Sequence, residues 1–149
     1  MVGGGWWVVG GGHGSTTIYH LPPTIYHQMK TILVVDDDRS LRRLYKAELE
    51  AEGYKVRLAE NGRQAMDSVS EKTPDLVIMD IRMPEMDGLE ATVRVLREQK
   101  SVPIILNTAY SCYQDNFLAW AADGYIIKSA DLQPLKDKVR EVLGCTAAA

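Results

Sequence analysis

Three features are scarce in this chain of 149 residues: cysteine, long apolar runs and, over the first 28 residues, charge. The two cysteines, Cys112 and Cys145, match neither a disulfide framework nor a metal motif, which is typical of reduced thiols in a cytosolic protein. The longest apolar run spans only residues 117–122, whereas a membrane-spanning helix needs about 20 residues. We therefore expect a cytoplasmic protein without a membrane span.

Charge divides the chain into two parts. The net charge of −3 comes from 17 basic and 20 acidic side chains, a balance that does not indicate a nucleic-acid partner. Residues 1–28 carry none of these charges, although they hold all three histidines. We interpret residues 1–28, here called the leader, as a non-native or disordered segment. Residues 29–144 have the length of one domain, and 145–149 form a short tail.

Two functional hypotheses for the leader fail on local grounds. The glycine-rich stretch 10–14 resembles a dinucleotide-binding turn, but such a turn must open a helix, and the β-prone residues 15–19 do not favour one. Three histidines at intervals of seven could bind a metal only on a helix, which two intervening prolines prevent. These are His13, His20 and His27. A repeated Thr-Ile-Tyr-His tetrapeptide favours a duplicated or non-native leader instead.

From Met29 onward, short apolar runs alternate with amphipathic segments. The runs predict buried strands over 31–35, 54–58, 76–79, 103–108 and 124–127. The amphipathic segments predict helices over 40–52, 62–72, 89–100, 111–122 and 132–143, with Phe117, Leu118 and Trp120 as core candidates. This alternation indicates an α/β fold, a doubly wound five-stranded parallel sheet with helices on both faces.

Polar residues follow four of the predicted strands: Asp36 and Asp37, Asp80, Thr108, and Lys128. Ligands of doubly wound folds bind outside the carboxyl ends of the strands, so these side chains should converge. Three carboxylates brought together need a cation, and oxygen ligands suit Mg²⁺. A lysine and a threonine beside them can stabilise phosphoryl oxygens. These are the components of phosphoryl transfer to an aspartate.

Five motifs in this order resemble the response-regulator receiver domain of two-component systems, the CheY-like family, over residues 29–143. The motifs are ILVVDD at 32–37, PDLVIMD at 74–80, MPEMDG at 83–88, TA at 108–109 and GYIIK at 124–128. The resemblance implies a flavodoxin-like fold with strand order 2-1-3-4-5. It also implies a phosphoacceptor in signalling, which catalyses only its own phosphorylation and dephosphorylation and is not otherwise an enzyme.

By position, the resemblance implies that Asp80 accepts the phosphoryl group of a sensor histidine kinase or a histidine phosphotransfer protein. Asp37, Asp80 and the backbone carbonyl of Arg82 would bind Mg²⁺ directly, and Asp36 would act on the metal through water. The downstream partner would be a protein rather than nucleic acid or membrane. Because no output domain follows residue 144, we expect a stand-alone receiver, either a monomer or a phosphorylation-dependent dimer.

The resemblance further implies a switch. Thr108 and Lys128 would contact the phosphoryl group, and Tyr125 would move inward with Thr108, changing the face formed by the fourth helix, fifth strand and fifth helix. Arg82 and Tyr110 occupy the two positions that tune phosphate lifetime in the family. Both are bulky, so we expect them to shield the phosphate from water.

One departure and two rival functions stay open at this point. Ser129 stands where the family has a proline, often with a cis peptide bond, so the bond after Lys128 is either trans or strained. Asp36 and Asp38 also resemble the nucleophile and acid/base of haloacid-dehalogenase-type phosphohydrolases, although Asp38 equally suits a helix N-terminus. A receiver-like binding module that is never phosphorylated is the second rival.

Overall fold

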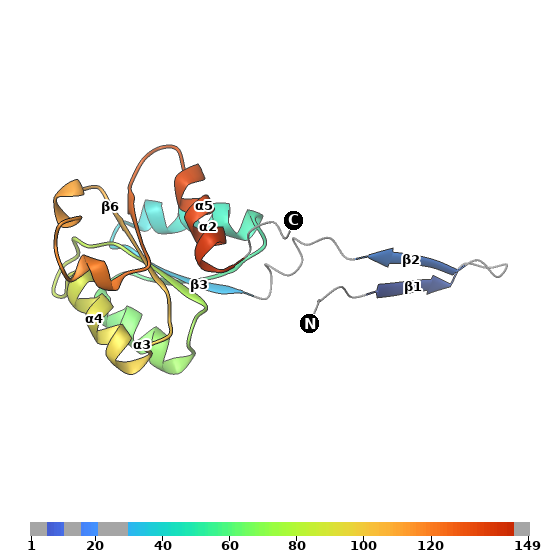
Figure 1. The fold of residues 1–149 in the computed structure, drawn as a ribbon, viewed down its shortest axis with the longest axis horizontal. Coiled ribbons are helices and arrows are strands. Elements are labelled where there is room, and N and C mark those ends of the chain that lie inside the picture. The colour runs from blue at the N-terminus through green and yellow to red at the C-terminus, as the bar shows by residue number, and fades with distance from the viewer. Residues whose placement is uncertain (1–5, 11–15, 21–29, 145–149) are drawn as a thin grey trace.

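The computed structural model describes residues 6–10, 16–20 and 30–144 (Figure 1). In the leader, β1 (Trp6–Gly10) and β2 (Thr16–His20) pair antiparallel as a sheet of their own. The residues after the glycine-rich stretch are thus extended, and the helix that a dinucleotide site requires does not form there. His13 and His27 lie outside the described residues, so the assignment of the leader as non-native or disordered stays a prediction.

The larger sheet is parallel and has the order β4-β3-β5-β6-β7. Its strands are β3 (Thr31–Val35), β4 (Lys55–Ala59), β5 (Leu76–Met79), β6 (Ile104–Thr108) and β7 (Gly124–Ile127). Numbered within this sheet, the order is 2-1-3-4-5, which confirms the expected flavodoxin-like topology. The most polar strand, β4, lies at an edge, where only one neighbour covers it.

Four α-helices cover the two faces of this sheet, as Figure 1 shows. They are α2 (Arg39–Ala51), α3 (Gly62–Glu71), α4 (Gly88–Glu98) and α5 (Gln133–Val142). Successive residues of β3 enter opposite cores, because side chains alternate along a strand. Ile32 packs with residues of α2 and α5, whereas Leu33 packs with residues of α3 and α4. Within the described ranges, none of the helices is long and apolar enough to span a membrane.

The helix expected over 111–122 is not present, and this prediction was wrong. The segment forms two short 3₁₀ turns, Ser111–Tyr113 and Ala119–Ala121, in place of an α-helix. Phe117 and Trp120 are 72% and 75% exposed, so neither is a core residue as expected. Among the described residues, four α-helices therefore accompany the five parallel strands, one helix fewer than expected.

Local hydrogen bonding explains why this segment does not continue as a helix. The backbone N–H groups of Gln114, Asn116 and residues 119–122 bond to carbonyls three residues earlier, which is the 3₁₀ pattern. The side chain of Asn116 accepts a hydrogen bond from the N–H of Leu118 at 2.9 Å. Asparagine competes in this way with helical backbone bonds, and such turns favour short helical pieces.

Candidate functional site

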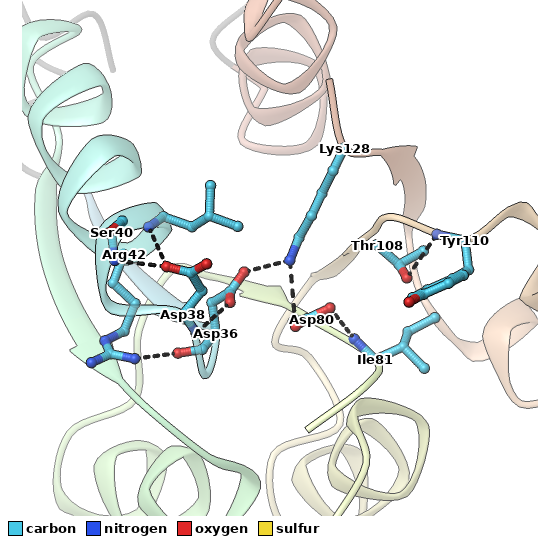
Figure 2. Close-up of polar contacts among 10 residues, drawn as sticks. Asp36, Asp38, Ser40, Arg42, Asp80, Ile81, Thr108, Tyr110 and Lys128 are labelled. Carbon is cyan, nitrogen blue, oxygen red and sulfur yellow. Dashed lines mark hydrogen bonds and ion pairs between the residues drawn. The ribbon is translucent and has the colours of Figure 1, made fainter. Parts of the chain in front are cut away.

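The predicted residues meet where the order of strands reverses. The chain passes from β3 to β4 on one side and then returns to β5 on the other. Asp36 directly follows β3, and Asp80 directly follows β5, so their side chains lie at adjacent strand ends (Figure 2). A crevice at such a point is where doubly wound folds bind ligands.

Three carboxylates form the acidic part of the site. One oxygen each of Asp36, Asp37 and Asp80 lies within 4.8 Å of the others. Asp36 is 1% exposed and Asp80 is 6% exposed, whereas Asp37 faces solvent. A cluster of carboxylate oxygens open to water on one side suits Mg²⁺, which prefers oxygen ligands and keeps several waters.

Lys128 supplies the opposing charge. Its Nζ atom lies 2.7 Å from Asp36 Oδ2 and 3.4 Å from Asp80 Oδ2, so one ammonium group bridges the two buried carboxylates (Figure 2). The backbone N–H of Lys128 donates to the carbonyl of Thr108 at 2.7 Å, which ties the ends of β7 and β6 together. The lysine is therefore placed by the sheet and is not a free surface lysine.

The surroundings of Asp80 disfavour the ionised form of its carboxyl group. Burial, followed by repulsion from Asp36, raises the pKa of Asp80 to about 6, against the opposing pull of Lys128. Burial alone would lower the pKa of Lys128, but its hydrogen bond and charge interaction with Asp36 raise the pKa instead. At neutral pH, the site thus holds more carboxylate charge than its one ammonium group balances.

The loop after β3 fixes Asp36 and begins α2. Asp36 Oδ1 accepts a hydrogen bond from the N–H of Asp38 at 2.9 Å. Asp38 in turn caps α2, because its Oδ1 accepts from the N–H groups of Ser40 (2.8 Å) and Leu41 (3.2 Å). The guanidinium of Arg42 donates to the Asp36 carbonyl at 2.6 Å. Asp38 therefore has the helix-terminus role that its position suggested.

The motif at 83–88 has a steric explanation. The N–H of Gly88 donates to the carbonyl of Ile81 at 2.7 Å, which folds the start of α4 back on the loop after β5. A Cβ atom at Gly88 would lie 1.8 Å from the carbonyl oxygen of Asp80. Only glycine permits this approach, so the motif holds the loop that carries Asp80 and Arg82 against α4.

Tyr110 connects the remaining predicted residues. Its N–H donates to Oγ1 of the buried Thr108 at 3.3 Å, and its carbonyl accepts from the hydroxyl of Tyr125. The guanidinium carbon of Arg82 lies 4.8 Å from the centre of the Tyr110 ring, which is a cation–π contact. Tyr110 thus contacts Thr108 and Tyr125, the two expected switch residues. It also contacts Arg82, the other bulky residue expected to tune phosphate lifetime.

The peptide bond between Lys128 and Ser129 is trans, which decides the alternative that the sequence left open. The loop that follows is shaped by Ser129 itself. Its Oγ atom accepts a hydrogen bond from the N–H of Asp131 at 2.9 Å, a local turn of the type serine favours.

Sequence reasoning missed two buried polar residues beside the site. Tyr45, on α2, and Asn107, on β6, are only 2% and 3% exposed. The available signal was a polar residue directly after the buried apolar residues 104–106.

The fold and the site together define a class of protein: a doubly wound α/β domain with a buried aspartate, two further carboxylates and a lysine at its switch point. The family model described as the response regulator receiver domain matches residues 32–140. The chain belongs to the response regulator receiver domain family, and it is therefore a signalling domain of the phosphoryl-accepting, two-component type.

Similar proteins agree with this assignment. Transcriptional regulatory protein ZraR of Klebsiella oxytoca is 43% identical over 117 residues, which are 77% of this chain and 26% of ZraR. Response regulator MprA of Mycolicibacterium vanbaalenii is 37% identical over 114 residues, which are 75% of this chain and 49% of MprA. The chain thus spans from about a quarter to a half of these relatives.

Solved structures agree as well. Response regulator TrrA of Thermotoga maritima, crystallised in complex with Mg(2+)-BeF, has a TM-score of 0.75 and 46% sequence identity, covering 76% of this chain and 99% of TrrA. In a complex of histidine kinase ThkA with TrrA, the matching chain has a TM-score of 0.73 and 46% identity, covering 77% of this chain and 99% of that chain.

Proposed function

We propose that Asp80 is the phosphoacceptor of this receiver. The observation that carries the proposal is the position of Asp80, buried at the switch point with Lys128 at 3.4 Å and two further carboxylates within reach. A carboxylate oxygen of Asp80 attacks the phosphorus of a phosphohistidine, the P–N bond breaks, and the imidazole leaves with a proton. The product is an acyl phosphate on Asp80.

The carboxylates of Asp37 and Asp80 and the backbone carbonyl of Arg82 would hold Mg²⁺, with Asp36 acting on it through water. When bound, the ion neutralises negative charge on the carboxylates and phosphoryl oxygens. The crystal of TrrA with Mg(2+)-BeF supports this cofactor for a relative with 46% identity. Lys128 would release part of its contact with Asp36 to pair with a phosphoryl oxygen.

Signalling would begin at Thr108. Its hydroxyl turns to the phosphoryl group, and the hydrogen bond that it now accepts from Tyr110 is lost. Tyr110 also accepts from the Tyr125 hydroxyl, so Tyr125 is released to move inward. The face made by residues 111–122, β7 and α5 then changes, and a partner protein binds it.

The partners follow from the class and from its relatives. A sensor histidine kinase or a histidine phosphotransfer protein would supply the phosphoryl group, as the ThkA–TrrA complex supports. The output would be a protein contact or a phosphorylation-dependent dimer in the cytoplasm. Action without a separate output domain stays a prediction, because the matched relatives are longer than this chain.

Two rivals are weaker. A phosphohydrolase would need Asp38 as its acid/base, but Asp38 accepts two backbone hydrogen bonds at the start of α2. Its nucleophile, Asp36, is engaged by Lys128 at 2.7 Å and by the N–H of Asp38. A receiver-like module that is never phosphorylated would show no reaction in the test that follows.

The deciding experiment exposes the full chain to acetyl phosphate or beryllofluoride with Mg²⁺ and measures the added mass and changes in the NMR spectrum. We expect one phosphoryl group on wild type and none on Asp80→Asn. Asp67→Asn changes an exposed aspartate of α3 and serves as the matched control. Modification of Asp36 would favour the hydrolase, and no modification of wild type would favour the unphosphorylated module.

A further inference from the structure

Arg42 lies on α2, and its side chain is only 12% exposed. Its Nη1 atom donates to the backbone carbonyl of Asp36 at 2.6 Å (Figure 2). Its Nη2 atom lies 3.7 Å from Oε2 of Glu60, the residue directly after β4. One guanidinium group therefore contacts both the loop after β3 and the first residue after β4.

The carbonyl that Arg42 holds belongs to the peptide group between Asp36 and Asp37. A peptide group is planar, so a hydrogen bond to its oxygen restrains the orientation of the whole group. That orientation sets the directions in which the two aspartate side chains leave the backbone. Asp36 and Asp37 are two of the three residues whose carboxylate oxygens lie within 4.8 Å of one another.

Other contacts of this loop act on different groups. The N–H of Asp36 donates to the carbonyl of Ala59 at 3.2 Å, and its Oδ1 atom accepts from the N–H of Asp38 at 2.9 Å. Lys128 contacts Oδ2 of Asp36 at 2.7 Å. Asp37 is exposed, so the position of its carboxylate depends mainly on the backbone that carries it.

The contact of Arg42 restrains this backbone without occupying a carboxylate oxygen. It donates to a neutral carbonyl, whereas Lys128 is the cation that bridges the carboxylates of Asp36 and Asp80. A guanidinium suits this task, because its planar fork presents donors in fixed directions toward two partners. A lysine ammonium group on a flexible stem would not hold both loops in the same way.

We propose that Arg42 is a positioning residue for Mg²⁺ binding, because its bond to the Asp36 carbonyl orients the peptide group from which the Asp36 and Asp37 carboxylates project. Its effect passes through the backbone and through these two carboxylates. Interactions that orient metal ligands commonly change metal affinity by tenfold or more when they are removed. For its effect on affinity, this inference rests on the proposed Mg²⁺ site, but its second test does not.

The first test measures Mg²⁺ affinity, because position and charge predict opposite results. Arg42→Met removes a positive charge close to the acidic cluster, so charge alone would make Mg²⁺ bind more tightly. Loss of positioning would weaken binding, and we expect about tenfold weaker binding in an NMR titration of the full chain with Mg²⁺. If Arg42→Met does not fold, Arg42→Lys takes its place, and we expect it to bind severalfold more weakly than wild type.

The neighbouring arginine is the matched control. Arg43 is the next residue of α2 and is exposed. Arg43→Met removes the same charge from the same helix and leaves the contact of Arg42 with the loop in place. It should bind Mg²⁺ as tightly as wild type or slightly more tightly. Unchanged or tighter binding in Arg42→Met would overturn the proposal.

The second test needs neither metal nor phosphate. The N–H of Asp38 donates to Oδ1 of Asp36, so its hydrogen exchange reports how firmly the loop is held. In EDTA, we expect this exchange to be severalfold faster in Arg42→Met, beyond any change at Leu33 in β3, and unchanged in Arg43→Met. Exchange that does not change in Arg42→Met would overturn the proposal. A wild type that binds no Mg²⁺ would instead contradict the proposed metal site, and the exchange would decide whether Arg42 orients the loop.

Discussion

The carboxyl group of Asp80 lies in surroundings that oppose its charge. The carboxyl is buried and close to Asp36, and the single ammonium group of Lys128 is shared between them at 2.7 and 3.4 Å. A group that must attack phosphorus has to be ionised, and a cation would supply the missing positive charge. If Asp80 is the phosphoacceptor, as we propose, this destabilised carboxylate would favour attack on a phosphoryl donor once a cation is bound.

We predict that Asp80→Asn stabilises the metal-free protein above pH 6. The folded-state pKa of about 6 exceeds the ordinary 3.8, so the folded state binds more protons between these values and stability falls as pH rises through them. The variant should gain roughly 1–3 kcal/mol at pH 8 in EDTA, and the gain should vanish near pH 4. Denaturant unfolding at both pH values measures it. A less stable variant at pH 8 would show that the pairing with Lys128 outweighs burial.

Arg82 and Tyr110 are expected to protect the acyl phosphate. The guanidinium of Arg82 lies 4.8 Å from the centre of the Tyr110 ring, so the two bulky side chains form one unit that we expect to exclude water from the phosphate. Arg82→Ala and Tyr110→Ala should each speed the loss of phosphate severalfold, measured as the decay of the phosphorylated protein after the donor is removed. Unchanged decay in both variants would contradict this role. Arg63→Ala, an exposed arginine of α3, is the control.

At the scale of elements, neighbouring acidic residues have different tasks. Asp38 belongs to α2, because it caps the first turn, whereas Asp37 belongs to the acidic cluster. Sequence alone placed three consecutive aspartates after a strand. Their hydrogen bonds differ, because among these three aspartates Asp38 is the one that accepts from the N–H groups at the start of α2.

We predict opposite effects for alanine substitutions at the adjacent residues Asp37 and Asp38. Asp38→Ala should lower the free energy of unfolding by about 1 kcal/mol and leave Mg²⁺ affinity nearly unchanged. Asp37→Ala should weaken Mg²⁺ binding severalfold with little loss of stability in EDTA. Denaturant unfolding and fluorescence or NMR titration with Mg²⁺ measure the two effects, and each variant is the control of the other. Loss of Mg²⁺ binding in Asp38→Ala would contradict the division.

The segment 111–122 shows where pattern and structure diverge. Its apolar spacing favoured a helix. Instead, the side chain of Asn116 accepts a backbone hydrogen bond, and backbone hydrogen bonds between residues three apart produce short 3₁₀ turns. Phe117 and Trp120 consequently face solvent. Helical periodicity indicates which face of a helix would be apolar. It does not indicate whether the backbone remains helical when local polar side chains compete for its hydrogen bonds.

At the scale of the whole molecule, the five-stranded sheet is built from residues 31–127 and its covering helices end at residue 142. The two core clusters likewise draw on residues of this part of the chain. Together with the match of the family model to 32–140, these bounds support the prediction that residues 29–144 form the domain.

We therefore predict that deleting residues 1–28 leaves the domain intact. The melting temperature and the rate of modification by acetyl phosphate with Mg²⁺ should match those of the full chain, with stability unchanged to within about 0.5 kcal/mol. Calorimetry and mass spectrometry measure both. A large loss of stability would show that the leader belongs to the domain after all.

Much about this protein could be predicted from sequence. Strand ends are visible as apolar β-branched runs that stop at Asp36, Asp80, Thr108 or Lys128, and the rule for parallel sheets brings such ends to one edge. The class of fold and the order of its strands followed from these local signals, combined with the resemblance that the motifs carry. The same signals predicted that the acidic residues and Lys128 lie together at one edge of the sheet.

Only the tertiary structure decided how those residues are partnered. The raised pKa of Asp80 depends on burial and on charges that lie 44 and 48 positions away in the chain, at Asp36 and Lys128. The contacts of Tyr110 with Tyr125 and with Arg82 likewise join separate segments of the chain. Hydrophobic patterns are local and survive in sequence, whereas hydrogen-bond partners and electrostatic surroundings exist only once the chain has folded.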